Sequence, residues 1–143
     1  MHDRPFSKEL RYLLAGFAPM LAAATLMAWL NFHYSADRGL WPLIFAIQLF
    51  LNSLYAAAST YLAHYTGYRS IGLAWRHHTL LGMALAMHTF LYFKLQIDWS
   101  AANAWESLNL VQRVVYNAWT PWNIYLLSFG ILAWLSFRRR KPH

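Results

Sequence analysis

The sequence predicts an all-α membrane protein with four transmembrane helices, in a single polytopic domain that takes in residues 1–143. Apolar residues make up 59% of the chain and charged residues only 12%, whereas about a quarter of the residues of a soluble globular protein are charged. Long apolar runs alternate with short polar segments. The basic residues gather at the ends of these runs, a pattern typical of membrane orientation.

The first span is predicted over residues 12–30, which hold no charged residue and approach the about 20 residues that cross a hydrocarbon core. Arg4, Lys8 and Arg11 precede it. A signal peptide is the alternative, but the run is longer than the apolar core of about 7–15 residues in such peptides. Pro19 lies in mid-run and predicts a kink, because proline removes a helical hydrogen bond.

The second and third spans are predicted over residues 40–63 and 78–97. The second is uncharged, and Pro42 suits a first helical turn. The third combines an apolar run with Lys94, whose long side chain can reach the interface while its stem stays in the membrane. We expect the loop of residues 64–77 between these spans to be cytoplasmic.

The fourth span is predicted over residues 114–137, with Pro121 bending its outer part and Arg138 opening a basic closing segment. Residues 98–113, which precede it, combine tryptophans with small and apolar residues. We expect a short helix there, capped by Ser100 and lying in the outer membrane–water interface.

Most of the 12 Lys and Arg residues lie at the two chain ends and in the loop between the second and third spans. The opposite side carries Arg38, Lys94 and Arg113. Because cytoplasmic segments of membrane proteins are rich in Lys and Arg, we predict an inner-membrane protein with both termini in the cytoplasm. The net charge of +7 then indicates anionic lipid headgroups and not nucleic acid.

The two halves of the chain resemble one another. Residues 13–16 read Leu-Leu-Ala-Gly near the start of the first span, and residues 80–82 read Leu-Leu-Gly near the start of the third. Each half runs outward, turns, and returns to a basic end. Two duplicated helical hairpins of this kind are common in transport proteins, whose binding sites lie near mid-membrane between the repeats.

Catalytic patterns are missing from the sequence. There is no cysteine, and none of the 5 acidic residues lies within a predicted span. The absence of cysteine excludes disulfides and thiolate metal sites. We find no paired carboxylates, no nucleophile with a neighbouring base and no glycine-rich phosphate loop. The sequence therefore predicts a protein that is not an enzyme and that holds no metal or cofactor.

A polar path near the middle of the membrane is predicted from four side chains that fall at similar depth at about 1.5 Å per helical residue. They are Gln48, Asn52, His88 and Ser128. Such a path could pass the hydroxyls of a sugar or a proton. The alternative is hydrogen bonding between helices, worth about 0.6 kcal/mol per pair. His88 favours function, because an ionisable group inside a membrane is a functional candidate by default.

A lipid-phosphate site is predicted at the cytoplasmic ends of the spans, because arginine binds phosphate with two parallel hydrogen bonds. The candidates are Arg11, Arg69, Arg76 and Arg138. Arg11 and Arg76 are the strongest of them, since they begin the two outward-running helices. The alternative is that these residues only set the topology and attract anionic lipids.

Histidines near the cytoplasmic face raise the alternative of one b-type haem, which needs two His at matched depth on separate helices. His64 ends the second span, and His77 or His78 begins the third. The other interpretation is that these histidines lie beside lipid headgroups. A zinc site from the same residues would lack a fourth protein ligand.

The chain resembles the GtrA-like proteins, which are small four-span membrane proteins, in three stretches. Residues 9–17 are similar to the family's opening, residues 61–65 to the end of its second helix, and residues 128–138 to its closing pattern of Ser-Phe, Trp and Phe-Arg. Residues 130–133 depart from the family, which usually has a polar pair there. The resemblance implies a role in cell-envelope polysaccharide synthesis, for which movement of a polyprenyl-phosphate-linked sugar across the inner membrane is the usual proposal.

The leading functional hypothesis is therefore a non-enzymatic component that translocates, or helps to translocate, such a lipid-linked sugar. A four-helix monomer has little room for a sugar, so a transporter should be a homodimer. The second hypothesis is an accessory subunit of a larger membrane complex, such as a respiratory one. The third is a membrane subunit with a single haem b. Membrane lipids are expected partners in all three.

Overall fold

The computed structural model describes residues 5–35, 37–94, 106, 108–116 and 120–139, and none of these residues lies in a β-strand. The protein is all-α, as predicted. Its elements are α1 (Pro5–Tyr34), the 3₁₀ turn η1 (Arg38–Leu40), α2 (Trp41–Thr66), α3 (Ile71–Lys94), α5 (Leu110–Tyr116) and α6 (Thr120–Arg138).

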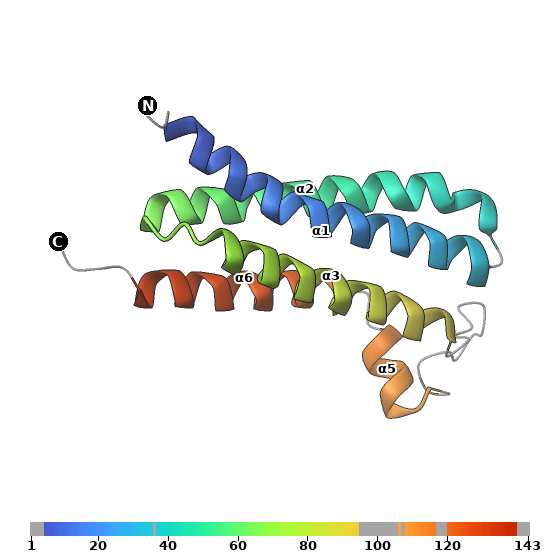
Figure 1. Ribbon diagram of the computed structural model, residues 1–143. Coiled ribbons are helices and arrows are strands. Elements are labelled where there is room, and N and C mark those ends of the chain that lie inside the picture. Colours follow the sequence, from blue (N-terminus) through green and yellow to red (C-terminus); the bar gives the residue numbers. More distant parts are fainter. Residues whose placement is uncertain (1–4, 36, 95–105, 107, 117–119, 140–143) are drawn as a thin grey trace.

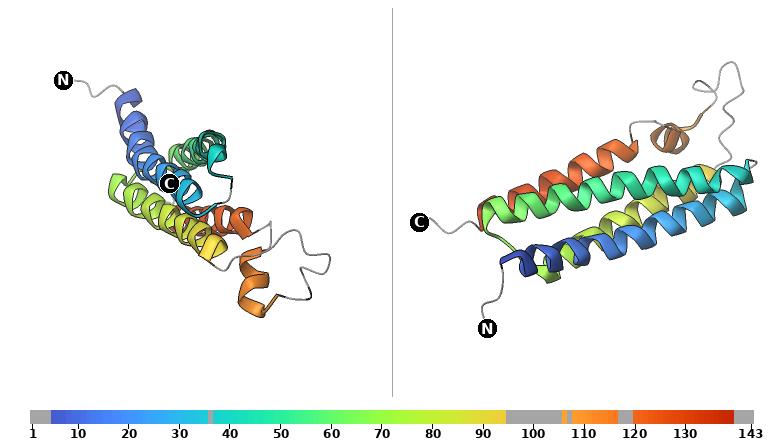
Figure 2. Two further views of the ribbon diagram at one scale, coloured as in Figure 1. Left: turned by 90° about the vertical axis from the view of Figure 1, so that its right-hand side faces the viewer. Right: turned by 90° about the horizontal axis from the view of Figure 1, so that it is seen from above.

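The four long helices lie side by side in a bundle (Figure 1). α1 packs along both α2 and α3, and α6 packs against α2 and α3 on the other side of the bundle (Figure 2). α1 begins and α6 ends at the same end of the bundle, where α2 is also linked to α3. The short helix α5 lies beside the opposite end of α3.

Several helix boundaries differ from the predicted spans, and α1 (Pro5–Tyr34) extends beyond residues 12–30 at both ends. α3 begins at Ile71, so the predicted loop is mostly helical and the residues before 78 extend the third helix. The predicted fourth span is divided, because Leu110–Tyr116 forms α5 and a new helix begins at Thr120. Pro121 then falls in the first turn of α6, where proline is tolerated. Most of the predicted interfacial segment, including Ser100, lies outside the described residues.

The link between α2 and α3 is short because α2 ends in a left-handed glycine. Gly67 has a φ of 72°, and its N–H donates to the His64 carbonyl oxygen at 3.2 Å. Glycine adopts this conformation without the steric cost of a Cβ atom, and the bond satisfies a carbonyl at the helix end. The chain can therefore re-enter a helix at Ile71.

α1 and α3 approach closely at positions where one helix has no side chain. A Cβ atom added to Gly82 would lie 2.9 Å from the Ala23 Cβ, and one added to Gly16 would lie 2.9 Å from the His78 ring. Small residues allow membrane helices to pack backbone against backbone. The core beside this contact is formed by Met20, Met27, Tyr55, Leu81, Leu85 and Tyr125.

The outer surface of the bundle is apolar, whereas several of its most buried side chains are polar. Leu80 of α3 is 67% exposed and Leu126 of α6 is 70% exposed, while Asn52 and His78 are both 0% exposed. Among the described residues, two helices, α1 and α2, are long and apolar enough to cross a membrane. α3 carries Arg76 and three histidines, which make it less apolar than these two.

Candidate functional site

The first of two buried polar clusters, which we call the amide cluster, consists of Gln48 and Asn52 of α2 and Tyr125 of α6. Gln48 Nε2 donates to the Tyr125 hydroxyl at 2.6 Å and to Asn52 Oδ1 at 3.3 Å. The Tyr125 hydroxyl donates to Asn52 Oδ1. Asn52 Nδ2 donates to the Met20 carbonyl oxygen at 2.9 Å. The cluster therefore ties α2 to both α1 and α6.

The amide cluster follows from local helix geometry. Gln48 and Asn52 are four residues apart in one helix, so their side chains lie on the same face. Asn52 is completely buried and Gln48 is half-buried, and an unpaired amide in the bundle interior would cost free energy. Tyr125 supplies a hydroxyl from the facing helix, and Asn52 bonds to a main-chain oxygen of α1.

The second cluster, which we call the histidine cluster, consists of Tyr55 and Ser59 of α2 and His77 and His78 of α3. His78 Nδ1 lies 2.7 Å from the Ala74 carbonyl oxygen, and its Nε2 lies 3.0 Å from Ser59 Oγ. The Tyr55 hydroxyl lies 2.7 Å from His77 Nε2. The Tyr55 ring also contacts both histidine rings, stacked on that of His77 and edge-on to that of His78.

The tautomer of His78 follows from its partners. A carbonyl oxygen only accepts hydrogen bonds, so Nδ1 must carry the hydrogen that points to Ala74. Nε2 is then the acceptor when the ring is neutral, and Ser59 is its hydroxyl donor. Gly16 of α1 packs directly against the His78 ring and leaves no space for a side chain between them.

Ser59 and His78 together have the spacing of a nucleophile and a base. The surroundings do not suit hydrolysis, since Ser59 is 1% exposed and the ring is packed against Gly16. Ser59 also lies inside α2, where the neighbouring backbone N–H groups are engaged in the helix and cannot stabilise an oxyanion. The pair is therefore built to hold a hydrogen bond within the bundle.

Two members of the predicted midplane path lie apart from the amide cluster. His88 is half-buried and lies further along α3, two residues before Phe90, whose ring contacts Tyr34 at the end of α1. Ser128 is half-buried on α6, and no hydrogen bond joins its side chain to another described residue. The structure thus brings Gln48 and Asn52 together, adds Tyr125, and leaves His88 and Ser128 outside the cluster.

The four predicted phosphate-binding arginines have different surroundings. Arg69 Nη1 lies 2.6 Å from Glu9 Oε1 and Nη2 lies 3.1 Å from His64 Nδ1, so Arg69 is already paired. Arg138 lies over the Trp134 ring at 5.1 Å. Arg11 and Arg76 are exposed. Within the described part of the chain, no hydrogen bond or ion pair joins either of these two to another residue.

The same end of the bundle carries a further arginine contact that the sequence did not indicate. Arg139 Nη1 donates to the Tyr68 hydroxyl at 2.9 Å, and its guanidinium lies 5.5 Å from the centre of the Tyr68 ring. This contact joins the end of α6 to the short link between α2 and α3.

His64 and His78 do not fit the two axial positions of a haem. Both ring nitrogens of His78 are already hydrogen-bonded, to Ala74 and to Ser59, and its ring is packed against Gly16. His64 is exposed and lies 3.1 Å from Glu9 at the bundle end. In the described ranges, no group of three or more His, Asp or Glu side chains could hold a metal ion.

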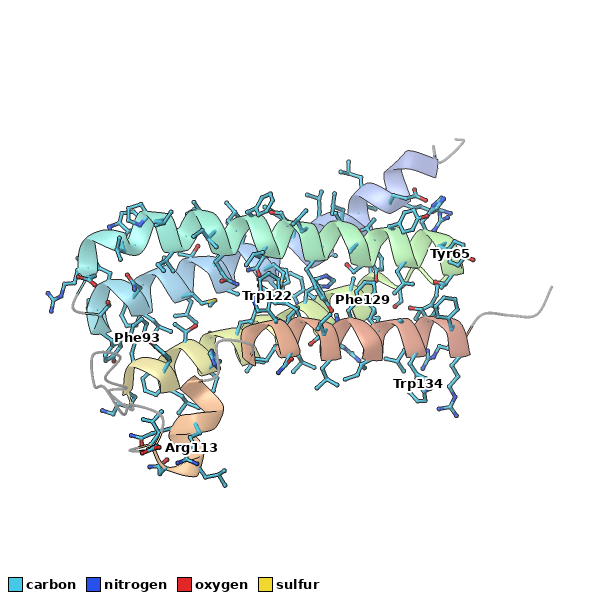
Figure 3. The ribbon with its side chains drawn as sticks, turned by 180° about the vertical axis from the view of Figure 1, so that it is seen from behind. Tyr65, Phe93, Arg113, Trp122, Phe129 and Trp134 are labelled. Atoms are coloured by element: carbon cyan, nitrogen blue, oxygen red, sulfur yellow. The ribbon has the colours of Figure 1, made fainter. Side chains whose placement is uncertain are left out.

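An apolar groove of about 310 Å³ runs between α2 and α6, and we call it the α2–α6 groove. Figure 3 shows Trp122 and Phe129 in the seam between the two helices, whereas Trp134 points away from it. Tyr55 and Tyr125 also line the groove, so it borders both polar clusters. The remaining lining residues are Leu51, Leu54, Ala58 and Leu126.

The sequence analysis missed Tyr55, Ser59 and Tyr125. The positions of the two tyrosines could have indicated their role, because both lie well inside predicted spans and not at their ends. A tyrosine buried at such a position requires a hydrogen-bond partner for its hydroxyl. Gly16 gave no such signal, since its importance depends on a ring from another helix.

Comparisons of the chain with protein-family models, with curated proteins and with solved structures found no match.

Proposed function

We propose that the chain is a four-span inner-membrane protein that translocates, or helps to translocate, a polyprenyl-phosphate-linked sugar. The observation that carries this proposal is the α2–α6 groove, which is apolar along its walls and has the amide cluster directly behind it. A lipid-linked sugar combines a long apolar chain with hydroxyl groups. The groove suits the chain, and Tyr125, a member of the amide cluster, lines it.

Four spans are supported by the apolar outer surface, which continues over α3 and α6. Large apolar side chains are exposed on all four long helices, among them Leu43, Phe50, Met83 and Leu127. In water such a surface would favour aggregation, whereas in a bilayer it contacts lipid tails. Buried polar side chains inside an apolar exterior are expected where hydrocarbon surrounds the protein.

Cytoplasmic termini are supported by the distribution of basic residues along the bundle. Arg11, Arg69, Arg76 and Arg138 are at the end where α1 begins and α6 ends, and Arg38 and Lys94 are at the other. The excess of positive charge indicates the cytoplasmic side. In the proposed function, the exposed Arg11 and Arg76, with Arg138, bind the lipid phosphate at this face, while Arg69 remains with Glu9.

The decisive experiment is native mass spectrometry of the protein released gently from its own membranes. We expect a co-purifying polyprenyl-phosphate glycan on the wild-type protein. Ala58→Trp should fill the α2–α6 groove and remove the bound lipid, because Ala58 lines it. Combined replacement of Arg11 and Arg76 by Ala should also reduce lipid occupancy, since it removes the phosphate ligands.

Ala57→Trp is the matched control. Ala57 is the exposed neighbour of Ala58 on the same helix and does not line the groove. It should retain the lipid. Equal lipid occupancy in the two tryptophan variants would exclude the groove as the binding site, and a wild-type protein without any polyprenyl lipid would contradict the proposed function.

An accessory subunit of a larger membrane complex is the second candidate. The observation that favours it is an exposed face of α1 on which the small residues Ala18, Ala22 and Thr25 form a shallow hollow beside Trp29. A partner helix can approach closely over such residues. The same mass spectra would show a stoichiometric complex with another protein, or the homodimer expected of a transporter.

A further inference from the structure

We propose that His78 is a reversible proton-binding site inside the bundle, with Ser59 as its proton-responsive partner. The inference goes beyond the movement of a lipid-linked sugar and depends on neither the groove nor the basic residues. It rests on the number of hydrogens available to the contacts around His78.

In the neutral state these contacts have one hydrogen too few. His78 Nδ1 donates its hydrogen to the Ala74 carbonyl oxygen. Ser59 Oγ lies 3.0 Å from His78 Nε2 and 2.9 Å from the Ala56 carbonyl oxygen. The serine hydroxyl has a single hydrogen and both neighbours are acceptors, so it can satisfy only one of them.

Protonation of His78 satisfies all three contacts. Nε2–H then donates to Ser59 Oγ, and the serine hydroxyl turns to donate to the Ala56 carbonyl oxygen. The change requires one proton from water and the rotation of one hydroxyl hydrogen, with no movement of a heavy atom. The site gains one positive charge and keeps all three contacts.

When His78 is neutral and Ser59 donates to its Nε2, the Ala56 carbonyl oxygen still has a hydrogen-bond donor. The Thr60 hydroxyl donates to the same carbonyl oxygen at 2.7 Å. Ser59 is therefore available to donate to His78 Nε2 when the ring is neutral. The site accommodates both protonation states in one arrangement of atoms, which a merely structural histidine does not need.

The groups that face His78 limit the site to one proton. α1 presents Gly16, which has no side chain, and α2 presents Ser59 and the ring of Tyr55 at 5.6 Å. On α3, the His77 ring lies 5.5 Å away, so two imidazolium ions there would repel one another. α6 reaches the cluster through Tyr125, which contacts Tyr55. None of these groups is a carboxylate.

The positive charge has compensation from nearby dipoles. The carbonyl oxygens of Ala74 and Ala56 lie at the two ends of the hydrogen-bonded chain. A proton can therefore be held at this depth and released again, which is the requirement for coupling proton movement to a membrane process.

The test is nitrogen-15 NMR of histidine-labelled full-length protein in lipid nanodiscs, because the shifts distinguish the two neutral tautomers from imidazolium. The His78 signal, identified by its loss in His78→Gln, should change reversibly from the Nδ1–H tautomer to imidazolium as the pH is lowered. Ser59→Ala should lower the ratio of imidazolium to neutral ring about tenfold at fixed pH, as expected when one hydrogen bond to a charged group is lost.

Ser53→Ala is the matched control, because the Ser53 hydroxyl donates to the Leu49 carbonyl oxygen in the same helix and contacts no histidine. It should leave the ratio unchanged. If His78→Gln does not fold, the signal that responds to Ser59→Ala but not to Ser53→Ala identifies His78. A His78 ring that remains neutral at the lowest pH at which the bundle stays folded, or a ratio unaffected by Ser59→Ala, would overturn the proposal.

Discussion

Gly16→Ala should destabilise the bundle by forcing the His78 ring away from Ser59. The added methyl group would lie 2.9 Å from both Cε1 and Nε2 of the ring and 3.2 Å from Cδ2. The ring is completely buried and is held by Ala74 and Ser59, so it cannot withdraw without losing a hydrogen bond. Overpacking of this kind costs about 1–3 kcal/mol, and we expect a loss of about 2 kcal/mol.

The free energy of unfolding can be measured by titration with sodium dodecyl sulfate in mixed micelles, with helical circular dichroism as the signal. Gly130→Ala is the matched control, because a Cβ atom at Gly130 of α6 meets nothing within 4 Å. That variant should be unchanged or more stable by up to about 1 kcal/mol, since alanine favours helices over glycine.

A double-mutant cycle between Gly16→Ala and His78→Ala identifies the cause. With the ring removed, the methyl group at residue 16 should cost little, giving a coupling energy of about 1–2 kcal/mol. The reasoning fails if Gly16→Ala is as stable as Gly130→Ala. It also fails if the cost of Gly16→Ala persists when His78 is alanine.

Three further predictions concern the amide cluster, the bundle end and the topology. Asn52→Leu should lower the free energy of unfolding by about 1–2 kcal/mol, and Tyr125→Phe by less, because Asn52 alone joins three helices; equal losses would contradict this. Glu9→Gln should reduce thermal stability at low ionic strength but not at high salt, since its ion pair is at the exposed bundle end; a loss independent of salt would exclude an electrostatic origin. Gly39→Cys and Ser70→Cys, introduced singly into this cysteine-free chain, should react with a membrane-impermeant maleimide from the outer and the cytoplasmic side respectively; labelling of both from one side would contradict the four-span topology.

The sequence predicted the long helices because their signal is local. The uncharged runs locate α2 to within about three residues of its ends, whereas α1 begins seven residues before its predicted span and ends four residues after it. The start of α3 was missed because Arg76, His77 and His78 resemble a polar loop, although a helix can carry these side chains at a bundle end. As a result His78 was interpreted as an interfacial residue, whereas it is completely buried.

The sequence predicted the part of the candidate site that is formed within a single helix, and it did not predict the contacts between helices. The spacing of Gln48 and Asn52 placed both side chains on one face without knowledge of the other helices. Their partner Tyr125, and the contact of His78 with Gly16, depend on how the helices are rotated against each other. The start of α5 had a local signal that we overlooked, since Asn109 and Gln112 exchange side-chain bonds to each other's backbone N–H at 2.8 and 3.0 Å, as in a capping box.

The bond from Asn52 to the Met20 carbonyl oxygen has a consequence for biogenesis. α1 and α2 are made first, and this bond pairs the most buried amide of α2 as soon as the first hairpin forms. The hairpin can therefore enter the bilayer with the Asn52 amide already paired. α6 is made last and adds Tyr125 to an amide that already has a partner. Insertion and assembly can thus proceed in the order of synthesis, hairpin first and closing helix last.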